Sequence, residues 1–264
     1  VTGDTDAFHW GTGTFASRGA VVAGNAVHAA ALRVREKVLR VAGEVLQEPL
    51  ERLELRDGRV WVKGQPGRSV TLGELASKAN PLRGAVRPGT EPGLEATEYF
   101  GPARGATASG VHAAILEVDP ETMRIEIQKY VVVHDCGTVL NPLILEGQVH
   151  GGVAQGIGNS YYEHLMYDEN AQLVNASFMD YLLPTSLDVP PIVVGHEETP
   201  SPLNPLGVKG AGEAGAIPTA ALFAQAVENA LPEIPLELLE IPLSPNRLWE
   251  LIQEADRPAA EPKV

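Results

Sequence analysis

The chain has 264 residues, a net charge of −14 and a single cysteine, Cys136. The excess of acidic residues argues against a nucleic-acid partner, because phosphates are bound by clustered lysines and arginines. One thiolate cannot assemble an iron–sulfur cluster or a structural zinc site. A chain with a single cysteine is typical of a reducing cytoplasm, where we expect this protein. Hydrophobic residues make up 44% of the chain, which allows a substantial core. No apolar run reaches the roughly 18 residues of a membrane span.

The first part of the chain predicts a loop, a long helix and a hairpin. Residues 1–20 are rich in glycine, threonine and serine, which is typical of a loop. From Val21 to Leu46, apolar residues recur every three or four positions, so this segment predicts a helix. The Asp57-Gly58 pair between the apolar runs of Leu53–Val62 predicts a β-hairpin. Thr71 and Glu74 form a capping-box pattern that opens a short helix.

The middle of the chain predicts a second hairpin followed by a glycine-containing helix. Val111–Val118 and Arg124–Val133 are strand-like segments separated by a turn, and the second leads into the polar residues His134–Gly137. Asn141 precedes Pro142, an arrangement that starts a helix, here expected to run to about Tyr162. A further turn is predicted at residues 168–172.

The last part predicts two helices and a tail. A helix is expected from about Glu213 to Leu231, with Pro218 in its first turn or at a kink. A shorter helix follows over Pro245–Ala255, and residues 256–264 are expected to be a disordered tail. Together the elements predict an α+β fold in which long helices pack on mixed β-sheets, as two intertwined lobes around a cleft lined by residues near 16, 148 and 213.

The glycine-rich segment 204–215 is the first candidate site. It places Lys209 and Glu213 four residues apart where the predicted helix begins. Backbone N–H groups at a helix start can bind an anion, and a carboxylate held beside them can act as a base. The alternative is a surface loop in which Glu213 only caps a helix.

The second candidate site is segment 146–156. Gln148 and Gln155 lie seven residues apart, on one helical face, with Gly151 and Gly152 between them. Amide side chains among glycines suit a heteroaromatic ligand with many hydrogen-bond donors and acceptors, such as a pterin. The alternative is a tightly packed helix pair in which Gln148 is hydrogen-bonded internally.

The third candidate is segment 13–19, where hydroxyls, backbone amides and Arg18 precede the long helix and could hold a phosphate. An ordinary capped helix start is the alternative. The seven histidines show no H-x-H or H-x-x-x-H spacing, so the sequence predicts no metal ion bound directly by the protein.

Taken together, these segments resemble the large subunit of the molybdenum hydroxylases, the superfamily of xanthine dehydrogenase, aldehyde oxidase and aerobic carbon monoxide dehydrogenase. The resemblance runs in order over nearly the whole chain, and the segments that carry it are Ala16–Gly19, His134–Pro142, Gly147–Gly152, Gly207–Glu213 and Ile241–Trp249. It implies that residues 1–264 are the C-terminal, molybdenum-cofactor-binding region of a larger or split subunit. The form of the loops is most similar to bacterial carbon monoxide dehydrogenase large subunits.

The resemblance also implies the roles of the site residues. Glu213 is the expected catalytic base in an oxidative hydroxylation of an aldehyde, an N-heterocycle or carbon monoxide, with water as the oxygen source. The expected cofactor is molybdopterin in its cytosine dinucleotide form, whose dithiolene holds the molybdenum in place of protein ligands. The expected cofactor-binding residues are Ala16, Ser17, Arg18, Gly19, Gln148, Gly151, Gly152 and Lys209. Independently of the resemblance, we expect Lys209 to shape the loop or the basicity of Glu213.

The same resemblance implies that other polypeptides complete the enzyme. The N-terminal portion of the molybdopterin subunit would supply further cofactor and substrate contacts, and partner subunits would carry iron–sulfur clusters and FAD. Alone, the chain is expected to be inactive. Two other functions remain open from the sequence: a non-catalytic cofactor-binding or assembly relative, and a phosphate or nucleotide binder unrelated to molybdenum.

Overall fold

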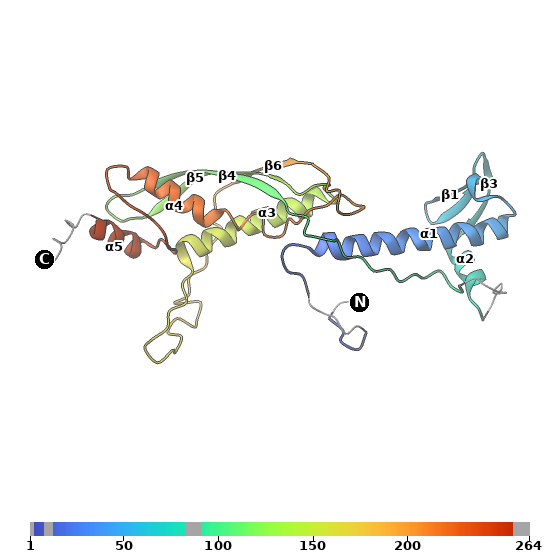
Figure 1. Cartoon of the computed structure of the whole chain (residues 1–264), viewed down its shortest axis with the longest axis horizontal. Coiled ribbons are helices and arrows are strands. Elements are labelled where there is room, and N and C mark those ends of the chain that lie inside the picture. The colour runs from blue at the N-terminus through green and yellow to red at the C-terminus, as the bar shows by residue number, and fades with distance from the viewer. Residues whose placement is uncertain (1–2, 8–12, 83–90, 256–264) are drawn as a thin grey trace. The chain divides into compact units, whose positions relative to one another are not determined.

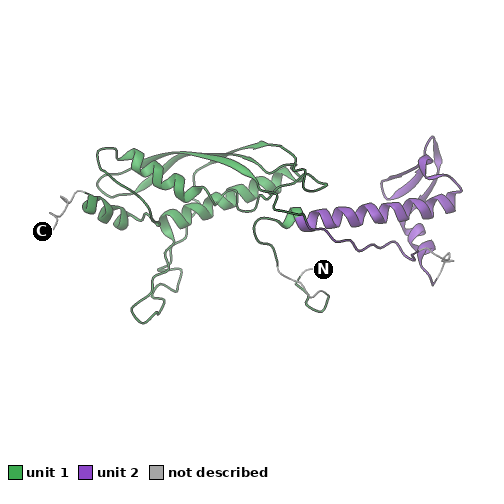
Figure 2. Ribbon diagram, in the orientation of Figure 1, with its two compact units in different colours: residues 1–21, 102–264 green, residues 22–101 purple. Residues whose placement is uncertain are grey.

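The computed structural model describes residues 3–7, 13–82 and 91–255, and the chain divides into two compact units (Figure 1, Figure 2). Unit 1 comprises residues 1–21 and 102–264, and unit 2 comprises residues 22–101. The expected α+β class with mixed sheets is confirmed. The predicted tail at 256–264 lies outside the described residues.

The elements follow one another along the chain with mixed helices and strands in both units. In order they are η1 (Ala20–Gly24), α1 (Asn25–Leu46), η2 (Leu50–Arg52), β1 (Leu53–Arg56), β2 (Arg59–Val62), β3 (Gln65–Thr71), α2 (Leu72–Ala79), β4 (Ser109–Val118), β5 (Ile125–Asp135), α3 (Pro142–Ile157), η3 (Gly158–Tyr162), β6 (Ile192–Glu197), α4 (Thr219–Ala230) and α5 (Pro245–Ala255). Within the described parts of the chain, no helix is both long enough and apolar enough to cross a membrane.

Unit 2 is a long helix packed on a small antiparallel sheet of order β1-β2-β3. The predicted hairpin is confirmed: Asp57 and Gly58 both have positive φ, as a tight two-residue turn requires. The capping box is also confirmed, because Glu74 N donates to Thr71 Oγ1 and Thr71 N donates to Glu74 Oε2. Strand β3 was not predicted. The core of this unit comprises Val38, Ala42, Leu53, Val60, Val62, Val70 and Leu75.

Unit 1 is built on a mixed sheet of order β4-β5-β6 (Figure 1). Strands β4 and β5 form the predicted hairpin, with Ser109 opposite Asp135. Strand β6, which was not predicted, pairs in parallel with β5 and places His196 beside His134. The mixed sheet therefore brings the polar ends of β5 and β6 to one edge.

Helices α3 and α4 pack on one face of this sheet. Helix α3 starts as predicted, since Asn141 Oδ1 accepts a hydrogen bond from Ile144 N. Its buried side joins the sheet in a core of Tyr130, Val132, Val149, Val153 and Ile157. The predicted start of the last long helix at Glu213 is wrong, because α4 begins at Thr219 after Pro218. Residues 213–218 form turns instead.

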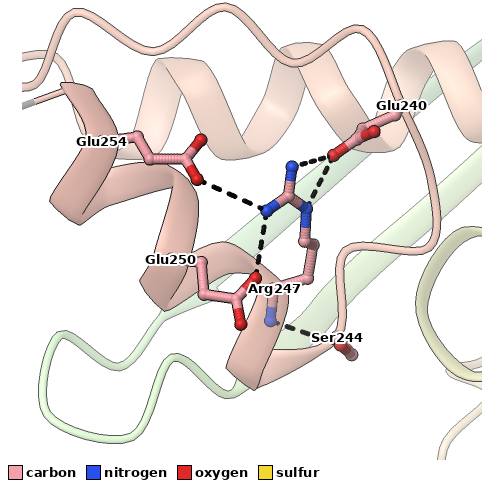
Figure 3. Close-up of polar contacts among 5 residues, drawn as sticks. All are labelled: Glu240, Ser244, Arg247, Glu250 and Glu254. Carbon is pink, nitrogen blue, oxygen red and sulfur yellow. Dashed lines mark hydrogen bonds and ion pairs between the residues drawn. The ribbon is translucent and has the colours of Figure 1, made fainter.

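Helix α5 matches its predicted bounds and is tied to the preceding loop by Arg247 (Figure 3). The guanidinium group binds Glu240 on the loop and Glu250 and Glu254 on the helix. Leu248 and Ile252, on the buried side of α5, pack into a core with Phe223 and Val227 of α4. Helix α5 is thereby fixed against α4.

Candidate functional site

Ser17 and Glu213 are joined by two hydrogen bonds, although they lie 196 positions apart in the sequence. Ser17 Oγ donates to Glu213 Oε2 at 2.5 Å, and Glu213 N donates to Ser17 Oγ at 2.9 Å. Ala16 and Ser17 both adopt left-handed backbone conformations, with φ of 50° and 52°. Such conformations are unfavourable for residues with a side chain and are often found at functional sites. One hydroxyl therefore fixes both the backbone and the carboxylate of Glu213.

The glycines before Glu213 allow this close contact. A Cβ atom at Gly210 would lie 3.1 Å from the Cβ and carbonyl oxygen of Ser17. One at Gly212 would lie 3.2 Å from Ser17 Oγ. Larger residues at either position would displace Ser17 from the carboxylate. Gly210 and Gly212 therefore allow the loop that carries Glu213 to lie against the segment that carries Ser17.

Gln148, on α3, also reaches this loop. Its Nε2 donates to the carbonyl oxygen of Gly212 at 2.9 Å. The three predicted segments around residues 17, 148 and 213 therefore meet at residues 212–213, all within unit 1. Glu213 and Gln148 are exposed and Ser17 is half-buried, so a bound molecule can reach them.

The two predicted glycines of α3 have different surroundings. Gly152 is buried, and a Cβ atom there would lie 2.9 Å from Gly215 Cα. The packing alternative thus accounts for Gly152, which lets α3 approach the backbone just after Glu213. Gly151 is exposed and borders a groove of about 490 Å³ that is also lined by His150, Ala154 and residues 184–186 and 189–192.

Lys209 is held by Asp135, at the end of β5. Its Nζ lies 3.1 Å from Asp135 Oδ2, and its N donates to the carbonyl oxygen of Cys136. Burial opposes ionisation of Asp135, but hydrogen bonds from Thr199, Gly137 and Lys209 outweigh it and hold the pKa of Asp135 well below its usual range. Lys209 thus attaches residues 207–213, the glutamate loop, to the sheet through its ion pair with Asp135.

Arg18 and Gly19 lie on the other side of Ser17. The guanidinium group of Arg18 stacks on the Phe15 ring, 3.9 Å from its centroid, and is exposed. Gly19 lies against Thr14, whose Oγ1 would be 3.3 Å from a Cβ atom at this position. Arg18 directly follows Ser17, so the segment that binds Glu213 also carries an exposed cation.

Sequence reasoning missed a polar group behind the loop, made of the half-buried His112 and the buried Tyr130 and Thr219. His112 Nε2 lies 3.1 Å from the carbonyl oxygen of Ala214, and His112 Nδ1 lies 2.9 Å from Tyr130 Oη. Tyr130 Oη in turn lies 3.0 Å from Thr219 Oγ1. No short motif reveals this group, because its members come from β4, β5 and α4. The only local signal is a histidine at an inward position of a strand.

The donor set can be tested against the expected cofactor. A hydroxyl, an amide, a guanidinium group and glycine-loop amides provide hydrogen-bond donors and acceptors for a polar heteroaromatic group. Within residues 3–7, 13–82 and 91–255, no cluster of three or more histidine, cysteine or acidic side chains could hold a metal ion. The donors and acceptors of these side chains fit a polar heteroaromatic cofactor.

The chain is similar to known proteins of one cofactor-binding family. The molybdopterin cofactor-binding domain family matches residues 1–190. The chain therefore belongs to this family of cofactor-binding domains. It is 39% identical to the nicotine 6-hydroxylase large subunit of Paenarthrobacter nicotinovorans, over 90% of this chain and 29% of that protein. It is 33% identical to the carbon monoxide dehydrogenase large chain of Hydrogenophaga pseudoflava, over 96% of this chain and 31% of that protein.

A solved structure shows the same fold. Quinoline 2-oxidoreductase from Pseudomonas putida 86 superimposes with a TM-score of 0.80 and 41% identity, over 94% of this chain and 31% of that one. The chain thus spans about three-tenths of the length of the relatives it matches. The resemblance found in the sequence is confirmed, and the relatives are oxidoreductases.

Proposed function

We propose that this chain forms one part of the active site of a molybdenum hydroxylase, with Glu213 as the catalytic base. The substrate class is an aldehyde, an N-heterocycle or carbon monoxide, and water is the oxygen source. The observation that carries the proposal is the pair of hydrogen bonds between Ser17 and Glu213, which orients an exposed carboxylate on a glycine-rich loop.

Several side chains around the glutamate loop are suited to hold the cofactor. Gln148 would hydrogen-bond the pterin, the backbone and side chains of residues 16–19 would line it, and the exposed Gly151 would border it. Gly152 would contribute indirectly, by letting α3 approach the backbone that follows Glu213. Bound molybdopterin supplies a metal centre that transfers water-derived oxygen and accepts two electrons from the substrate. Lys209 contributes indirectly, since its ion pair with Asp135 holds the loop that carries Glu213.

Glu213 moves the proton in this proposal. Its Oε2 accepts the Ser17 hydrogen bond, so we assign proton transfer to Oε1. Because Ser17 also accepts from Glu213 N, the carboxylate has little freedom to rotate away from the cofactor side. A base that is already held in its reactive position loses less entropy on the way to the transition state, and this raises the rate.

The complete enzyme in this proposal contains further polypeptides. The matched relatives include a large subunit, a large chain and the gamma subunit of a 6-hydroxypseudooxynicotine dehydrogenase complex. We infer that an N-terminal molybdopterin-subunit portion, an iron–sulfur subunit and a flavin subunit carrying FAD accompany this chain in the cytoplasm. We further propose the cytosine dinucleotide form of the cofactor.

The test is the substitution Glu213→Gln in the assembled complex. Benzaldehyde, quinoline, nicotine and carbon monoxide are assayed as substrates with a dye as electron acceptor, and molybdenum is measured in the same samples. We expect kcat to fall by at least about 100-fold, because general bases contribute on that order, with molybdenum content unchanged. Glu169→Gln, an exposed glutamate in a turn, is the matched control.

Two outcomes would contradict the proposal. Full turnover by the Glu213→Gln complex would remove Glu213 as the base. A wild-type complex that binds molybdenum but oxidises no substrate of these classes would favour the non-catalytic cofactor-binding relative.

A further inference from the structure

We propose that His112 is a positioning residue that orients Glu213 by holding the carbonyl group of Ala214. This inference rests on the proposed function of Glu213 as a base. It assigns a role to a side chain that reaches no bound molecule and acts only through the backbone of the glutamate loop.

The geometry places His112 behind the loop. His112 lies on β4 and Tyr130 on β5, on the same face of the sheet, with their rings edge to face at a centroid distance of 5.6 Å. From there, His112 Nε2 reaches the carbonyl oxygen of Ala214 at 3.1 Å. This carbonyl belongs to the residue that directly follows Glu213, 102 positions away from His112 in the chain.

The contacts fix the proton positions on the ring. A carbonyl oxygen can only accept, so Nε2 carries a hydrogen and donates it to Ala214. Burial lowers the pKa of His112, which favours the neutral ring, and the unprotonated Nδ1 then accepts from Tyr130 Oη. Burial likewise raises the pKa of Tyr130, so its hydroxyl keeps the proton that it donates.

A second anchor acts on the next residue. Thr219 Oγ1 donates to the carbonyl oxygen of Gly215 at 2.9 Å. Its oxygen lies 3.0 Å from Tyr130 Oη, but each hydroxyl has one hydrogen, and with these donated to Gly215 and to His112 the two oxygens are in contact without a hydrogen bond between them. The polar group of His112, Tyr130 and Thr219 therefore holds two successive carbonyl groups, those of Ala214 and Gly215. Gly215 is further clamped against α3 through Gly152 and Val149.

The two sides of Glu213 are consequently held by different elements. Ser17 binds its amide and carboxylate, and His112 binds the carbonyl of the following residue. The carbonyl oxygen of Glu213 is held by the amides of Ala216 and Ile217, so the peptide group between Ala214 and Gly215 is the part of this turn whose orientation depends on His112. Loss of the His112 hydrogen bond would free this peptide group and shift the carboxylate, whereas Gln148 and Arg18, which His112 does not contact, would stay in place to hold the proposed cofactor.

The test compares His112→Phe, which keeps ring bulk without the donor, with His112→Gln, which keeps a side-chain N–H donor. Both are made in the assembled complex, with the exposed histidine variant His164→Phe as matched control. We expect His112→Phe to lower kcat by about 10- to 100-fold, as a small misplacement of a catalytic group does. KM and molybdenum content should change little, and His112→Gln should recover kcat to within a few-fold of the wild type.

A second readout is independent of turnover. Nitrogen-15 NMR of labelled histidine in the full chain, with the His112 signal assigned by its loss in His112→Gln, should show a neutral ring protonated at Nε2. A ring protonated at Nδ1 would overturn the inference. If His112→Phe does not fold, Tyr130→Phe replaces it; wild-type kcat in that variant would overturn the role of the network.

The outcomes separate this inference from the proposed function. If Glu213→Gln abolishes turnover while His112→Phe folds and keeps the wild-type kcat, the positioning role is wrong and the base stands. If Glu213→Gln keeps full turnover, the proposed function itself fails. A fall in both kcat and molybdenum content in His112→Phe would assign His112 to cofactor retention and would also overturn the inference.

Discussion

Ser17 is the residue on which the site depends most directly. Its hydroxyl both donates to the Glu213 carboxylate and accepts from the Glu213 amide. The sequence identified Ser17 and Glu213 as separate candidates through a family resemblance, but no local pattern could show that one binds the other. Contacts between residues this far apart depend on the packing of the whole unit rather than on neighbouring residues.

Removing the Ser17 hydroxyl should lower the kcat of the assembled complex without loss of the proposed cofactor. We expect Ser17→Ala to lower kcat by about tenfold or more, because a hydrogen bond to a charged group contributes about 1.5–3 kcal/mol. Steady-state kinetics of the assembled complex with the best substrate measure this change. Ser109→Ala, at an exposed position on β4, is the control, and an unchanged kcat in Ser17→Ala would contradict the assigned role.

At the scale of elements, strong local sequence patterns predicted helices and hairpins correctly. Helices α1 and α3, both hairpins and the capping box were predicted from periodicity, caps and turn residues. Strands β3 and β6 were missed because β3 contains Pro66 and Gly67, and β6 contains Gly195 and is stabilised by parallel pairing with distant β5. The start of α4 was placed too early, since residues 213–217 turn onto α3 before Pro218.

The contact between α3 and the glutamate loop gives a stability prediction. Gly152→Ala places a methyl group against Gly215, and such overpacking lowers the free energy of unfolding by about 1–3 kcal/mol. Gly147→Ala, in the same helix but with open space around it, should raise it by about 0.4–1 kcal/mol. Urea denaturation of both variants measures the difference, and equal effects would show that the close approach is not maintained in solution.

At the scale of the whole molecule, every residue of the candidate site for which a contact is described falls within unit 1, while unit 2 carries a core of its own. The sequence predicted the fold class and the candidate site segments, but the inward strand position of His112 was its only sign of the polar group formed by His112, Tyr130 and Thr219. Such groups are assembled from three elements, and their members look like ordinary core residues when read singly.

Buried histidines make the stability of the fold depend on pH. Burial lowers the pKa of His112, and burial together with His196 lowers the pKa of His134. Below about pH 6.5, the ordinary pKa of histidine, His112 and His134 become protonated in the unfolded chain but stay neutral in the folded chain until the pH falls further. The free energy of unfolding is therefore largest above this pH. It decreases as the pH falls from there to the lower pKa values of the folded state.

Urea midpoints measured at pH 8, 6.5 and 5.5 should therefore decrease in that order. His112→Gln should flatten the dependence, whereas the exposed variant His164→Gln should leave its slope unchanged. Midpoints that are equal at pH 8 and 5.5 would contradict the buried, neutral state of these rings.

The most direct test of the account is the molybdenum content of the native complex, purified through a tag on this chain and analysed by elemental mass spectrometry. The partner polypeptides are identified in the same sample. We expect about one molybdenum atom per copy of the chain, as one cofactor per site requires, together with a second molybdopterin-type polypeptide portion. An intact partner complex without molybdenum would contradict the central claim that residues 16–19, 148 and 213 belong to a molybdenum cofactor site.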